Sequence, residues 1–61
     1  MYKIYYNSTT NQLEYNNQQL TYPARVTLKS VLTGELIPTT IISQADAEDL
    51  MVDEWELYIN P

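Results

Sequence analysis

The chain has 61 residues, with eight acidic and three basic side chains, a net charge of −5, and neither cysteine nor histidine. A chain of about 60 residues forms one domain, here residues 1–61, with a thin core, because it buries only about 60% of its unfolded surface. The composition excludes disulfides, thiolate and imidazole metal sites, and hydroxyl nucleophiles activated by histidine, so we expect a non-enzymatic protein without cofactor or metal.

Alternating side chains predict a first strand over residues 2–6. In such a strand Ile4 shares one face with Tyr2 and Tyr6, and we expect that face to enter the core. Tyr5 lies on the opposite face and is expected to be exposed. An exposed tyrosine offers a large contact area at low entropic cost, which makes Tyr5 a candidate contact for a partner.

Polar residues divide the following segment into short strands and turns. Asparagine tolerates positive φ, and serine and threonine hydroxyls bond to the nearby backbone, so clusters of these residues predict turns. In chain order the pattern predicts a turn over residues 7–11, a strand over 12–15, a turn over 16–18 and a strand over 20–22. Pro23 has no N–H group for a sheet ladder and is expected to end or bend the last of these strands.

The clearest strand signal covers residues 24–31, where small or branched apolar side chains alternate with polar ones. Gly34, the single glycine, predicts a tight turn with positive φ. Residues 36–42 are rich in β-branched side chains and predict the returning strand. Because Pro38 cannot donate a hydrogen bond to a neighbour, we expect this strand to lie at the edge of a sheet.

Ser43 and Asp46 have the spacing of a helix capping box, with Asp46 in place of the usual glutamate, and predict a helix over residues 44–52. One face of that helix is apolar and contains Ala47, Leu50 and Met51. Residues 55–59 alternate as a final strand, in which Trp55 is expected to face the core. The period leaves open whether the helix instead continues to Trp55.

These elements predict a β-rich α+β fold: a small antiparallel sheet or an SH3-like barrel of four or five short strands with one short helix. Residues 23–34, which read Pro-Ala-Arg-Val-Thr-Leu-Lys-Ser-Val-Leu-Thr-Gly, resemble the hairpin in the N-terminal SH3-like domain of elongation factor P. The resemblance implies a hairpin at this place and no function. The acidic C-terminal segment departs from that family.

Charge is unevenly distributed along the chain. The first 33 residues contain three bases and one acid, whereas the last 28 contain seven acids and no base. A charge run is usually a solvated face, but such a face normally interleaves bases with acids. This run has no base, and it contains aromatic residues of the kind enriched in interface hot spots. The candidate partner-binding residues are Asp46, Glu48, Asp49, Asp53, Glu54, Glu56, Tyr58 and Tyr5.

Three hypotheses for function follow. The first is a small acidic binding protein that occludes a basic surface of a partner protein, as a nucleic-acid mimic or inhibitor of phage or mobile-element origin would. The second is a self-associating structural subunit or assembly adaptor, since a thin core, an edge strand and surplus tyrosines favour association. The third is an SH3- or OB-type module that binds nucleic acid or peptide through Tyr5, Arg25 and Lys29.

The same composition bears on location and on other partners. No secretory h-region and no apolar run near the roughly 20 residues of a membrane span occurs, so we expect a cytoplasmic protein that does not bind membranes. Direct binding of nucleic acid is not expected, because lysine and arginine supply that affinity and the chain has three such residues.

Overall fold

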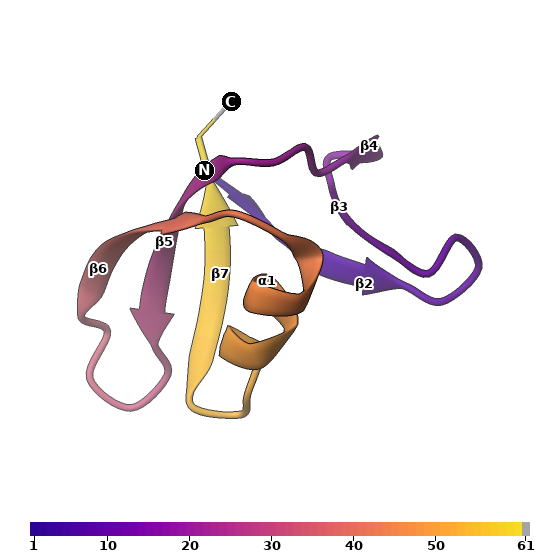
Figure 1. The fold of residues 1–61 in the computed structure, drawn as a ribbon. Helices are drawn as coiled ribbons and strands as arrows, with labels where there is room; N and C mark the ends of the chain where they lie inside the picture. The colour runs from indigo at the N-terminus through magenta and orange to yellow at the C-terminus, as the bar shows by residue number, and fades with distance from the viewer. Residues whose placement is uncertain (61) are drawn as a thin grey trace.

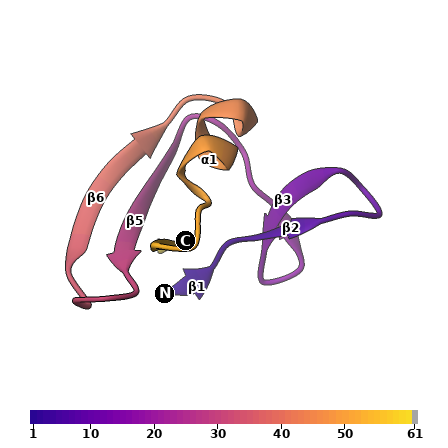
Figure 2. The same cartoon turned by 90° about the horizontal axis from the view of Figure 1, so that it is seen from below.

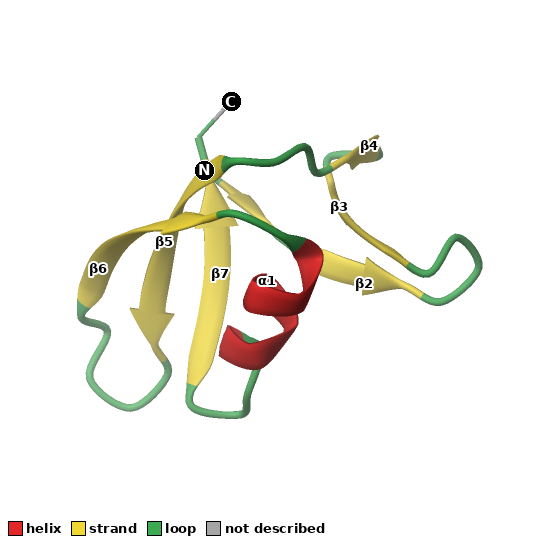
Figure 3. Cartoon of the chain, viewed as in Figure 1, coloured by secondary structure: helices red, strands yellow, loops and turns green. Residues whose placement is uncertain are grey.

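A computed structural model describes residues 1–60, which form seven short strands and one helix, a β-rich α+β fold (Figures 1 and 3). The helix is α1 (Gln44–Leu50). The strands are β1 (Tyr2–Lys3), β2 (Tyr5–Asn7), β3 (Gln12–Tyr15), β4 (Gln18–Gln19), β5 (Ala24–Ser30), β6 (Leu36–Ile41) and β7 (Trp55–Ile59).

The strands form two antiparallel sheets. The larger has the order β1-β7-β5-β6, and the smaller has the order β2-β3-β4. Figure 2 shows the smaller sheet projecting to one side of the larger one, with α1 between them at one end. The sheets do not close into a barrel, so the expectation of an SH3-like barrel is not confirmed, and the four or five expected strands are seven shorter ones.

The N-terminal strand is divided at Ile4, which contradicts the expected continuous strand. Its first half, β1, pairs with β7, and its second half, β2, pairs with β3. Ile4 itself is buried, and its N–H donates to the Leu57 carbonyl oxygen at 2.8 Å. Because the chain changes sheets here, Tyr2 and Tyr6 do not follow Ile4 into the core and are 39% and 47% exposed. The expectation that both tyrosines are core residues is therefore wrong.

A two-residue hairpin connects β3 and β4. Asn16 and Asn17 both have positive φ, 47° and 63°, as a type I′ turn requires. The expected strand over residues 20–22 is replaced by β4 two residues earlier. Leu20 still donates its N–H to Leu13 at 2.9 Å and is buried, after which the chain bends toward β5. The buried side chain explains why this segment has the sequence pattern of a strand.

The hairpin of β5 and β6 agrees with expectation. Gly34 has a φ of 76° in the connecting turn. β6 is an edge strand of the larger sheet, as expected from Pro38, which lies opposite Thr27. Buried Ala24, Val26 and Leu28 alternate with more exposed residues along β5.

The helix begins as predicted, and the Ser43 hydroxyl accepts a hydrogen bond from the Asp46 N–H at 3.2 Å. It ends at Leu50, two residues before the predicted end, and β7 follows as the predicted final strand. Trp55 is half-buried against the core. The core consists of Ile4, Leu13, Leu20, Ala24, Val26, Leu28, Ile41, Ala47 and Leu57. α1 covers one face of the larger sheet (Figures 1 and 2), which leaves the other, outer face open.

Candidate protein-binding surfaces

The solvent side of α1 is acidic. Successive residues of an α-helix are rotated by about 100°, so the buried Ala47 turns the opposite side of this helix toward water. Asp49 lies opposite Ala47, whereas Asp46 and Glu48 lie about 100° to either side of Ala47, and all three are exposed. The sequence prediction grouped these three acids, and the structure places them on one element.

Two further acids follow the helix in the chain. Asp53 and Glu54 are exposed in the turn that joins α1 to β7. Two backbone hydrogen bonds hold this turn. The Trp55 N–H donates to the Val52 carbonyl oxygen at 3.0 Å, and the Val31 N–H donates to the Glu54 carbonyl oxygen at 3.0 Å. We call Asp46, Glu48, Asp49, Asp53 and Glu54 the acidic surface. In the part of the chain that the structure describes, none of these five carboxylates forms an ion pair.

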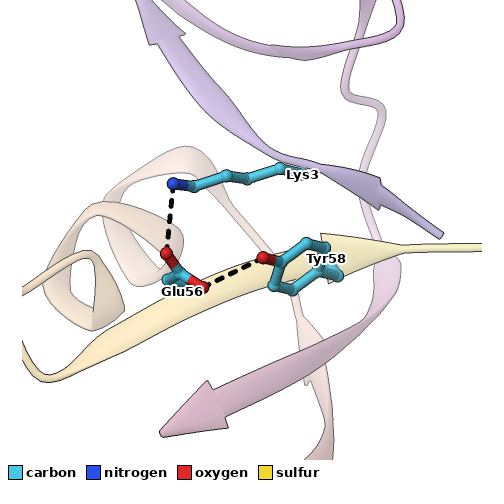
Figure 4. A network of polar contacts seen from close by, with 3 residues as sticks. All are labelled: Lys3, Glu56 and Tyr58. Atoms are coloured by element: carbon cyan, nitrogen blue, oxygen red, sulfur yellow. Dashed lines mark hydrogen bonds and ion pairs between the residues drawn. The ribbon is translucent and has the colours of Figure 1, made fainter. Parts of the chain in front are cut away.

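Glu56 is separated from the acidic surface by its position on β7. Its carboxylate accepts one hydrogen bond from the Lys3 ammonium at 3.2 Å and another from the Tyr58 hydroxyl at 2.9 Å (Figure 4). The hydrogen bonds from Tyr58 and from Lys3 hold the pKa of Glu56 below its usual value. The same contact with Glu56 raises the pKa of Tyr58. Glu56 and Tyr58 thus form a paired network on the outer face of the larger sheet.

The outer face carries all three bases of the chain. Arg25 and Lys29 occupy the β5 positions that alternate with its buried residues, so they point to the outer face. Lys3 lies opposite Tyr58, which lies opposite Thr27 on β5, and directly paired residues share a face. The Lys29 ammonium lies 6.0 Å from the centre of the Tyr58 ring. The chain therefore presents an acidic helix side and a basic sheet face in different directions.

Tyr5 lies apart from the acidic surface, on the smaller sheet. It is 39% exposed, pairs with Glu14 across β2 and β3, and its hydroxyl donates to the Glu14 carboxylate at 3.4 Å. Its neighbour Tyr6 points to the other side of β2 and reaches α1. Alternation along residues 2–6 predicts that Tyr6 lies in the core. The prediction is wrong because the strand breaks at Ile4, where β1 pairs with β7 from the far end of the chain.

A hollow of about 290 Å³ lies between β2 and α1 and is lined by Tyr6, Glu48 and Met51. The Tyr6 hydroxyl donates to the Asn11 side-chain oxygen at 2.9 Å. The Asn11 carbonyl accepts a hydrogen bond from the Gln44 side chain, also at 2.9 Å. Asn11 therefore connects the two walls of the hollow, one on the smaller sheet and the other on the helix.

Exposed apolar side chains gather on the β5–β6 hairpin. Val31 and Leu32 in its turn are 54% and 84% exposed, and Leu36 and Ile37 at the start of β6 are 54% and 37% exposed. We call these four residues the apolar hairpin. Leu36 and Ile37 are consecutive in β6 and point to opposite faces of the sheet, so the four side chains share the hairpin but do not form one continuous patch.

Three further findings concern what the chain resembles and contains. Among residues 1–60, no three acidic side chains gather in a way that would hold a metal ion. Within the same residues, no helix is long and apolar enough to cross a membrane. In comparisons with known proteins, no family model, no curated protein and no solved structure matches this chain.

Proposed function

We propose that the protein is a non-enzymatic acidic binding protein that occludes a basic surface of a partner protein. The observation that supports this function is the separation of charge. Five unpaired carboxylates lie along α1 and the following turn, while the bases lie on the outer sheet face. Within residues 1–60, the most acidic part of the molecule therefore has no ion-paired base.

Such an arrangement favours an external cationic partner for two physical reasons. Like charges three or four residues apart on a helix repel each other, and Asp46 and Asp49 have that spacing. A partner's lysine and arginine residues would relieve this repulsion. The separated charges also give the molecule an electric dipole, and complementary fields orient and accelerate protein association. A basic surface that normally binds nucleic acid is one such target, so inhibition by mimicry belongs to this proposal.

The test is affinity capture from a cell lysate with the full-length chain, followed by identification of bound proteins by mass. The variant D49N/E54Q removes two charges from the acidic surface. The control E35Q/T40K changes the net charge by the same amount on the β5–β6 hairpin. We expect the wild type to capture a protein with a basic surface that high salt releases. D49N/E54Q should no longer capture this protein, and the control should still capture it. Equal capture by both variants would contradict the proposal.

One observation favours a second function, self-association through the apolar hairpin. Four apolar side chains of this hairpin are exposed, and a chain of this size gains stability by association. Pro38 supplies no N–H to a continued ladder, so this contact would use hairpin side chains rather than an added strand. Sedimentation velocity distinguishes the two functions. If the chain self-associates, L32S weakens association and V52S, beside the acidic surface, does not. A chain that stays monomeric at high concentration rules this function out.

A further inference from the structure

We propose that the hollow between β2 and α1 binds a single arginine side chain of the basic partner. This inference rests on the proposed function and adds which residue type the site selects. The hollow is lined by an aromatic ring, a carboxylate and a thioether, from Tyr6, Glu48 and Met51. It lies beside the acidic surface, because Glu48 belongs to both.

The size of the hollow limits the ligand. Sites for whole small molecules usually measure about 300–1,000 Å³. At about 290 Å³ and lined by three residues, this hollow is at the lower end of that range. It suits one long side chain that enters from a neighbouring protein.

The chemistry of the lining matches the three parts of an arginine side chain. The flexible, polarisable Met51 accommodates an aliphatic stem. The Tyr6 ring offers a π-face to a planar guanidinium group, and the Glu48 carboxylate offers two oxygens to its forked N–H groups. Lysine has the same charge and a similar stem, but a compact and strongly hydrated ammonium that neither stacks nor forms a fork.

The hollow is held in place before a ligand arrives. The Tyr6 hydroxyl is bonded to Asn11 at 2.9 Å, which restrains the ring. Gln44, at the start of α1, bonds to the same asparagine at 2.9 Å. Glu48 is not neutralised by any cation in the part of the chain that the structure describes. A site whose aromatic wall is restrained before binding loses less entropy when a ligand binds.

The experiment compares a capped nonapeptide of arginine with one of lysine, each titrated into the full-length protein by calorimetry at low salt. Both peptides carry the same charge, so their long-range attraction to the acidic surface is the same. Any fork preference at the other carboxylates is common to the wild type and to variants that keep those carboxylates, so the variants at Tyr6 isolate the part that belongs to the hollow. Because of stacking and the fork, we expect arginine to bind roughly 3- to 10-fold more tightly than lysine.

Variants assign this preference to the hollow. Y6L is expected to lower the arginine-to-lysine ratio, because it removes the stacking surface, whereas Y6F, which keeps the ring, retains it. Y2L, at a tyrosine on β1 that is 39% exposed and does not line the hollow, is the matched control and should leave the ratio unchanged. D53N should weaken the binding of both peptides by a similar factor. Circular dichroism confirms that each variant is folded.

The outcomes separate this inference from the proposed function. Two results overturn the arginine site while leaving the acidic surface as a binding surface. One is equal binding of the two peptides, and the other is an arginine-to-lysine ratio that is as large in Y6L as in the wild type. If neither peptide binds, the proposed function fails and the arginine site fails with it.

Discussion

Glu56 illustrates at the residue scale how neighbours decide the role of an acid. It belongs to the same acidic run as Asp53 and Glu54, yet among the described residues it is the acid that forms an ion pair, with Lys3 at 3.2 Å. Strand alternation turns it to the outer face, where β1 brings Lys3 beside it. Ionised Glu56 therefore stabilises the folded sheet, and this stabilisation depends on pH.

We expect E56Q to reduce the loss of stability at acid pH. The pKa of Glu56 is lowered in the folded state, first by Tyr58 and then by Lys3, so ionised Glu56 favours folding. This stabilisation is complete above the ordinary glutamate pKa and is lost as the pH falls through the lowered value. Urea midpoints should therefore differ between wild type and E56Q at pH 7 and converge toward pH 3. A difference that does not change with pH would contradict the pairing, and E35Q serves as the control.

A second prediction concerns the β3–β4 turn. Asn17 has a φ of 63°, a region that costs non-glycine residues about 1–2 kcal/mol but that asparagine adopts more readily. We expect N17A to lower the free energy of unfolding by about 1 kcal/mol, and N17G to preserve or raise it. Denaturant unfolding measures both changes. N60A, at an exposed asparagine, is the control and should have the free energy of unfolding of the wild type. If N17A also has the wild-type value, the turn does not have the described conformation.

At the scale of elements, Ile4 joins the two sheets. Its side chain is in the core and its N–H bonds to β7, while the strands on either side of it pair with different partners. The smaller sheet thus connects to the larger one through a single buried residue at this point. A change at Ile4 should therefore affect the whole molecule rather than one hairpin.

The comparison of I4A with I42A tests this role with the same chemical change. Ile4 is 1% exposed and Ile42 is 71% exposed. Truncation of a buried isoleucine to alanine costs about 2–5 kcal/mol, which approaches the whole stability of a domain this small. We expect I4A to be largely unfolded by circular dichroism and I42A to remain close to wild type. A folded I4A with native stability would contradict the described core.

Local sequence patterns predicted some elements and missed others for identifiable reasons. The β5–β6 hairpin, the start of α1 and β7 were predicted, because alternation, Gly34 and the Ser43 cap act over a few residues. The break at Ile4 was not, because it depends on the pairing of β1 with β7, more than 50 residues along the chain, while β2 pairs locally with β3. For the same reason the exposure of Tyr6 and its place beside Glu48 were missed. The acids were grouped as a charge run along the chain, and the structure places three of them on α1 and Glu56 on β7.

At the scale of the whole molecule, charge separation is the main organising feature. The alternation of β5 directs Arg25 and Lys29 outward, and α1 packs on the other face, so its acids point away from them. If the acidic surface serves a partner, part of its charge should be unfavourable for the free protein. Asp49 is the clearest test, because a negative charge near the C-terminal end of a helix opposes the helix dipole.

We therefore expect D49N to stabilise the free protein while weakening its binding to a basic partner. The gain should be about 0.3–0.5 kcal/mol at low salt, from reduced repulsion and a better interaction with the helix dipole. Thermal unfolding at low and high salt measures it, since salt screens exposed charges. A loss of stability in D49N would show that Asp49 supports the fold instead.

The most direct test of the acidic surface is a map of backbone amide shifts while the lysine nonapeptide is titrated into labelled protein. The proposed function predicts shifts at residues 44–54, over α1 and the following turn, that are present at about 0.1 M salt and disappear near 1 M, where the screening length falls to about 3 Å. Shifts concentrated on β5 and the outer sheet face, or no shifts at all, would contradict it.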